Sequence, residues 1–185
     1  MPLPPPTSPR KPIHTRTIVC NGYRRDDGLW DIEGHLVDTK AYTFENAWRG
    51  TMTPGTPVHE MWLRLTIDDE FLVHDVAAST DNSPFEICPA VVPKFRELVG
   101  LRIAKGWRKD VRARLGGAQG CTHLVELALG ALATAAVQTI FPVRALENPE
   151  LDRRAKPGHL DTCHALVSDG PVVRQHWPLH YTGPR

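Results

Sequence analysis

Alternation of apolar and polar residues predicts two antiparallel hairpins in the first half of the chain. TRTIVCNGY (15–23) and LWDIEGHLVD (29–38) are expected to form two strands around the turn RRDDG. HEMWLRLTI (59–67) and FLVHDVAAST (71–80) are expected to form a second pair around DDE. Because side chains alternate across a strand, the apolar positions of one strand should share a face.

The same alternation assigns candidate polar residues to faces. Trp30 and Leu36 share one parity and should face the core, whereas Asp31 and His35 take the other face. His59 has the parity of the apolar positions in its strand, so its imidazole should face the buried side.

Helical patterns dominate the second half of the chain. VVPKFRELVG (91–100) predicts a short helix, and the polar segment 104–115 is expected to lead into a long buried helix. That helix, THLVELALGALATAAVQTIF (122–141), should stop before Pro142. Residues 160–181 predict a last short hairpin. Strands followed by helices indicate an α+β fold, with antiparallel hairpins forming a meander packed on the long helix.

The length of the chain suits one compact domain with tails. It has 185 residues, of which 41% are hydrophobic. The proline-rich residues 1–13 are expected to form a disordered arm, and residues 14–142 a single α+β domain. Residues 143–185 are expected to be a linker and the C-terminal hairpin, packed on the same domain.

Charge and apolar content limit the class of partner. A net charge of +1 from 22 basic and 21 acidic residues predicts no nucleic-acid partner, so a small-molecule substrate is expected. No apolar run is expected to reach the length of a membrane span, and no membrane partner is expected. The N-terminal segment lacks the apolar stretch of a signal peptide, which predicts a cytoplasmic protein. The composition leaves a homo-oligomer open.

GGAQGCTHLVEL (116–127) places a thiol and an imidazole at the start of the long helix. Unpaired N–H groups at a helix N-terminus favour a thiolate, so Cys121 is a candidate metal ligand or nucleophile. His123 is a candidate ligand or base, and Glu126 shares its helix face. Alternatively, Cys121 only caps the helix in a small space and Glu126 only complements the helix dipole.

The first hairpin carries a dense set of charges. Asp31 and His35 project from one face, and Lys40 is expected on the other face, farther along the same strand. These three residues are candidate catalytic groups that orient a polar substrate or transfer protons. Alternatively, they are solvated surface charges.

RTIVCNGYRRDDGLWDIEGHLVDTK and GCTHLVEL resemble a bacterial family of domains of unknown function, of the DUF2889 type. A more distant similarity is to iron–sulfur scaffold proteins of the NifU and IscU type, which place a strand pair, helices and three cysteine ligands in the same order. This similarity implies that Cys88 takes the second ligand position and Cys121 the third. His59 stands where the first cysteine would be, and His123 would be a further ligand.

The leading hypothesis is an enzyme that acts on a small organic substrate by lyase or hydrolase chemistry. Its site would consist of His59, Cys88, Cys121 and His123, a mixed nitrogen and sulfur set that suits zinc or iron as the cofactor. Without a metal, Cys121 or His123 would act as nucleophile or base. The alternatives are an iron–sulfur or sulfur-transfer accessory protein, and a small-ligand binding module whose thiols belong to the core.

Overall fold

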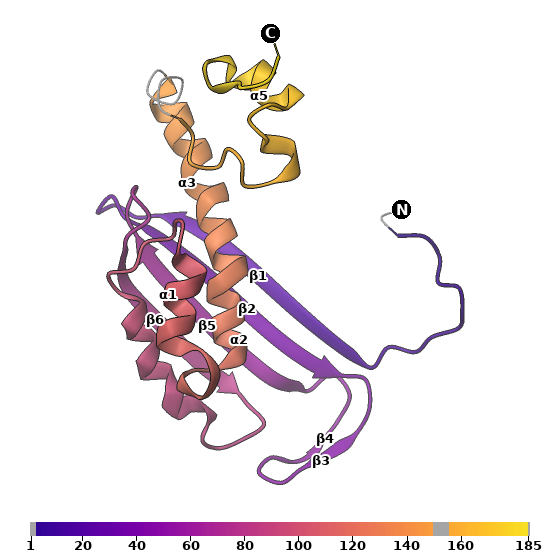
Figure 1. The fold of residues 1–185 in the computed structure, drawn as a ribbon. Helices are drawn as coiled ribbons and strands as arrows, with labels where there is room; N and C mark the ends of the chain where they lie inside the picture. The colour runs from indigo at the N-terminus through magenta and orange to yellow at the C-terminus, as the bar shows by residue number, and fades with distance from the viewer. Residues whose placement is uncertain (1–2, 150–155, 185) are drawn as a thin grey trace. The chain divides into compact units, whose positions relative to one another are not determined.

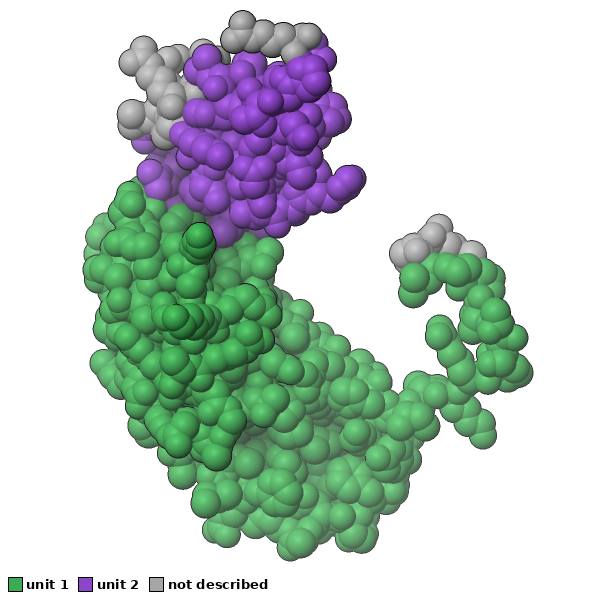
Figure 2. Space-filling model, viewed as in Figure 1, with its two compact units in different colours: residues 1–136 green, residues 137–185 purple. Residues whose placement is uncertain are grey.

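The computed structural model describes residues 3–149 and 156–184, and the chain forms two compact units (Figure 2). Met1–Ala136 form the first unit and Val137–Arg185 the second. Residues 3–13 are exposed and have no helix or strand. The predicted disorder of this arm, and the predicted packing of residues 143–185 on the main domain, stay predictions.

Four strands of the first unit form an antiparallel sheet in the order β1-β2-β5-β6 (Figure 1). These strands are β1 His14–Arg24, β2 Trp30–Lys40, β5 Pro57–Ile67 and β6 Val73–Asn82. The short strands β3 Phe44–Asn46 and β4 Gly50–Met52 form a separate hairpin. Both predicted hairpins are confirmed, and pairing of β2 with β5 joins them into the predicted meander.

Helices cover one face of β2, β5 and β6, and the opposite face of these strands is open (Figure 1). The edge strand β1 is exposed at almost every position. The covering elements are η1 Cys88–Leu98, α1 Trp107–Leu115, η2 Gly117–Gln119, α2 Thr122–Glu126 and η3 Leu127–Leu132. β2 follows the predicted alternation, since Trp30, Ile32 and Leu36 are fully buried. Burial of these large apolar side chains between sheet and helices supplies the main stabilising term. The α+β class is confirmed.

The long apolar helix differs from its prediction at its C-terminal end. α2 and η3 continue into α3 Ala133–Glu147, which passes through Pro142, so the predicted end before this proline is wrong. Proline removes one backbone donor, and the other hydrogen bonds of the helix remain available. Thr122–Glu147 is long and apolar enough to cross a membrane, although buried helices of soluble proteins pass the same test. The expectation that no apolar run reaches this length is therefore wrong, and the cytoplasmic location stays a prediction.

Two other segments are helical where the sequence indicated something else. The polar segment 104–115, expected only as a connection, contains α1, whose buried residues Trp107, Val111 and Leu115 recur every four positions. The prediction of a C-terminal hairpin is wrong. This region contains η4 His164–Leu166, α5 Pro171–His176 and η5 Pro178–His180. Gly170 precedes α5, and Pro171 occupies its first position, where proline favours a helix start.

Gly34 on β2 lets the sheet approach the long helix closely. A Cβ at this position would lie 3.0 Å from Leu127 Cγ and Cδ1. Gly34→Val is therefore expected to lower the free energy of unfolding by about 1–3 kcal/mol, because the core must expand. Urea unfolding tests this, with Val37→Ile on the open face as a control expected to change by less than about 0.5 kcal/mol. Equal stability of both variants would contradict the close approach.

Candidate functional site

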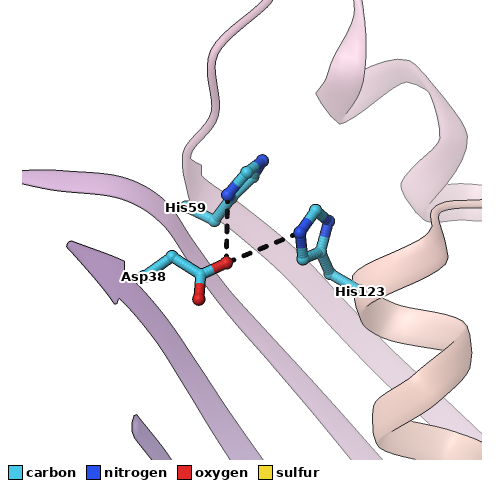
Figure 3. A group of neighbouring side chains, drawn as sticks. All are labelled: Asp38, His59 and His123. Carbon is cyan, nitrogen blue, oxygen red and sulfur yellow. Dashed lines mark ion pairs between the residues drawn. The ribbon is translucent and has the colours of Figure 1, made fainter. Parts of the chain in front are cut away.

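The site lies at one end of the covered face, where polar residues replace the apolar core. Arg16 of β1 stands opposite Asp38 of β2, which stands opposite His59 of β5, so three neighbouring strands present their side chains in one row. The first turn of α2 places His123 over this row (Figure 3). The alternation that buries the apolar side chains of β2 and β5 thus turns Asp38 and His59 toward the helices.

Asp38, His59 and His123 bring one potential metal-ligand atom each to within 4.8 Å of one another. His59 Nδ1 lies 3.1 Å from Asp38 Oδ2, and His123 Nε2 lies 3.5 Å from the same oxygen (Figure 3). The two imidazole ring centroids are 3.9 Å apart. We call these three residues the Asp38 group.

His59 Nδ1 is close to the carboxylate without an aligned hydrogen bond. Although only 3.1 Å separates it from Asp38 Oδ2, it is a buried side-chain atom that has no hydrogen-bond partner among the described residues. A buried polar atom without such a partner costs free energy. Either a bent hydrogen bond or two lone pairs directed at a common cation would account for this arrangement.

Asp38 is a buried carboxylate that stays ionised. Its side chain is 4% exposed. Burial alone would raise the pKa of Asp38, but hydrogen bonds from Arg16 and His14 outweigh burial and lower this pKa to about 2. Arg16 donates through Nε to Oδ1 and through Nη2 to Oδ2, both at 2.8 Å, and His14 Nε2 lies 3.0 Å from Oδ1. The carboxylate therefore keeps its charge and its orientation throughout the neutral range.

Both imidazoles of the group are neutral near pH 7. Burial, and then the proximity of His123, lower the pKa of His59 to about 4, although Asp38 acts in the opposite direction. Burial and the nearby charge of Arg16 also lower the pKa of His123. A carboxylate with two neutral imidazoles is the protonation state that a metal ion requires of such ligands.

Arg16 connects the edge strand to the helix. Besides its two bonds to Asp38, its Nη1 donates to Glu126 Oε2 at 2.9 Å. Two donated bonds in parallel fix the plane of the Asp38 carboxylate more firmly than a single bond would. Glu126, predicted only to share a face with His123, thus contacts the site through Arg16.

Cys121 lies beside His123, on the ring edge that faces away from Asp38. Its sulfur is 3.9 Å from His123 Nδ1, whereas His123 Nε2 faces the carboxylate. Cys88 begins η1, and among the described residues no recorded interaction joins it to His59 or His123. The structure thus places three of the four predicted ligands, His59, Cys121 and His123, near one another, and it places Asp38 beside the two imidazoles.

Two of the charged residues predicted as catalytic groups, Asp31 and His35, do not join this site. Asp31 and His35 point to the open face of β2, where Asp31 accepts from Thr66 Oγ1 at 2.6 Å and His35 stacks on Trp62 at 3.7 Å. Lys40 ends β2 opposite His14. The sheet separates Asp31 and His35 from His59 and His123, so the single site predicted from all these residues is not formed.

Sequence reasoning missed Asp38, Arg16 and His14 as site residues. Asp38 was not selected among the charges of its hairpin, yet it has the parity of Trp30 and Leu36. A carboxylate on the buried parity of a strand needs partners, and this was the signal available in the sequence. Arg16 and His14 have no comparable signal, because only the strand register places them beside Asp38.

The ligand spacing of the Asp38 group fits a small divalent cation. Nitrogen and oxygen ligands at 2.0–2.1 Å from a tetrahedral ion lie about 3.3 Å apart. The separations of 3.1 and 3.5 Å bracket this value. Two imidazoles and one carboxylate form the ligand set of many catalytic zinc and mononuclear iron sites, and a three-ligand set leaves a position for substrate.

Comparison with known sequences identifies one family. A family model described as "Protein of unknown function (DUF2889)" matches residues 14–138. No curated protein and no solved structure matches the chain. The resemblance to the NifU and IscU scaffolds therefore gains no support from solved structures.

Proposed function

Because the chain belongs to the DUF2889 family, whose description names no reaction, we propose a function from the Asp38 group itself. We infer an enzyme that binds one divalent transition-metal ion, zinc or iron, through Asp38, His59 and His123 and acts on a small organic substrate. Such an ion supplies Lewis acidity toward a substrate carbonyl or a water molecule. Hydrolysis or elimination on a carbonyl compound is the chemistry that follows.

The unaligned approach of His59 Nδ1 to Asp38 Oδ2 carries this proposal. Arg16 already pairs with Asp38, and two neutral imidazoles converge on one oxygen of the same carboxylate, which is the arrangement that a shared cation would use. The side chains of His59 and His123 are 18% and 22% exposed, which leaves room for a small substrate to reach the ion.

Each residue has a defined part in this proposal. Asp38, His59 and His123 hold the ion, Arg16 keeps the carboxylate oriented, and burial keeps the imidazoles unprotonated. Outer-shell partners of this kind change metal affinity by about 10–100-fold.

Zinc titration of protein produced without a His tag tests the metal site. One equivalent of Zn²⁺ is expected to bind, and Asp38→Asn, His59→Asn and His123→Asn should each weaken binding by more than about 100-fold, beyond the effect of an outer-shell residue. His35→Asn, on the opposite face, is the matched control and should bind like the parent protein. Equal affinity of His35→Asn and His59→Asn would overturn the site.

The enzymatic part has its own test, with 4-nitrophenyl acetate as the probe. Zinc-loaded protein is expected to hydrolyse this ester faster than metal-free protein, and Asp38→Asn should remove the difference. Zinc binding without zinc-dependent hydrolysis would overturn the hydrolytic assignment and leave the metal centre in place.

A second candidate function is binding of a small molecule on the open face of the sheet. A hollow of about 200 Å³ lies there, lined in part by Glu33, Trp62 and Arg64. Its volume is below the range of about 300–1,000 Å³ that is common for ligand sites, so we rank it second. A screen of aromatic fragments by tryptophan NMR signals, with Trp62→Ala as the negative control, tests it.

A further inference from the structure

The sulfur of Cys121 lies next to His123, on the side opposite the Asp38 group, and a second sulfur, that of Met61, contacts it. Cys121 Sγ is 3.8 Å from Met61 Sδ and 3.9 Å from His123 Nδ1. Met61 follows His59 by two residues on β5 and is 1% exposed, so its thioether is held in the core next to the thiol. The two nitrogens of one imidazole thus face different donor sets, with oxygen and nitrogen on one side and sulfur on the other.

The thiol of Cys121 does not cap the N-terminus of α2. Cys121 is the N-cap residue of α2, yet its side chain makes no capping hydrogen bond, and its backbone carbonyl accepts from Val125 N at 2.8 Å. The sulfur is directed at Met61 and His123 instead. Cys121 is half-buried, so an ion can reach this position from solvent.

We propose that Cys121, Met61 and His123 form a second metal site, selective for Cu(I). Thiolate and thioether sulfurs are soft ligands, and together with an imidazole they select Cu(I) over harder divalent ions. The site uses His123 Nδ1, whereas the Asp38 group uses Nε2. A neutral imidazole has one lone pair, so His123 serves one ion at a time, but neither site requires the other.

The distances distinguish the two sites. In a trigonal site with bonds of about 2.2 Å, ligand atoms lie about 3.8 Å apart, which matches the separations of 3.8 and 3.9 Å around Cys121. The Asp38 group has separations of 3.1 and 3.5 Å, as shorter bonds to nitrogen and oxygen require. The two separations that Cys121 makes, and the two that Asp38 makes, are thus compatible with the ion that each set of ligand atoms prefers.

Anaerobic competition of the full chain with bicinchoninate for Cu(I) tests the proposal. One equivalent of Cu(I) is expected to bind. Cys121→Ser should weaken binding by more than about 100-fold, and Met61→Leu by about 10-fold, because a thiolate binds more strongly than a thioether. Met61→Leu conserves volume, so the variant should fold, as circular dichroism will verify.

Variants of the Asp38 group provide the matched controls. His59→Asn and Asp38→Asn should keep Cu(I) affinity within about twofold while they lose zinc, and Cys121→Ser should keep zinc while it loses Cu(I). His123→Asn should lose both ions. Loss of Cu(I) in His59→Asn together with its retention in Cys121→Ser would overturn the sulfur site, and so would Cu(I) binding that neither Cys121→Ser nor Met61→Leu weakens.

Discussion

Asp38→Asn is expected to lower the free energy of unfolding of the metal-free protein by about 3 kcal/mol. The carboxylate is 4% exposed and accepts two hydrogen bonds from Arg16, and His14 lies at 3.0 Å. Asparagine conserves the shape, but it removes the charge and leaves the guanidinium facing an amide. Removal of one partner from a buried ion pair costs about 3–5 kcal/mol, and the partial exposure of Arg16 places this case at the lower end.

Urea unfolding in the presence of a chelator measures this effect without a contribution from metal. Glu126→Gln is the matched control, because it removes the other carboxylate that Arg16 contacts. That pair is exposed, so the control should lose less than about 1 kcal/mol. A stability of Asp38→Asn within about 0.5 kcal/mol of the parent protein would mean that Asp38 is not held as described.

The metal-free protein is expected to lose stability in two steps as the pH falls. The pKa of His59 is about 4 in the folded protein against 6.5 for an ordinary histidine, so the unfolded chain binds more protons between these values. The contribution of His59 is complete above pH 6.5 and is lost as the pH falls to 4, with a size of about 2–3 kcal/mol. His123, whose pKa is also lowered, acts in the same direction.

Asp38 contributes the second step. Its pKa is about 2 against an ordinary value of 3.8, so its contribution of about 2 kcal/mol is present above pH 3.8 and lost as the pH falls toward 2. Chemical unfolding at a series of pH values measures both steps. His59→Asn should flatten the first step and leave the second, and an unchanged slope between pH 6.5 and 4 in this variant would contradict the neutral imidazole.

The strands could be predicted from the sequence because their alternation is strong. β1, β2, β5 and β6 begin and end within about two residues of the predicted segments, and the parity of His59 was predicted correctly. The prediction of a hairpin in the C-terminal region was wrong for a physical reason. Its short apolar runs fit period two and period 3.6 equally well, so Pro171 after Gly170 was a stronger signal than the alternation.

The candidate site was only partly predictable, because it depends on register. His59 and His123 could be selected as residues, but their meeting with Asp38 requires the pairing of β2 with β5, which includes an irregularity after Asp38. A shift of one residue would turn Asp38 to the open face. No local pattern specifies that pairing. The resemblance to the iron–sulfur scaffold proteins placed Cys88 beside His59 and Cys121, and the structure shows no such contact among the described residues.

The position of His123 in the chain also has a consequence for biosynthesis. Asp38 and His59 leave the ribosome first, while His123 follows only after α1. A nascent chain that ends before α2 therefore contains two of the three residues of the Asp38 group, and the proposed ion would be captured only after the first turn of α2 has docked on the sheet. Binding of the proposed ion would then occur only in chains whose first unit, Met1–Ala136, has completed its folding.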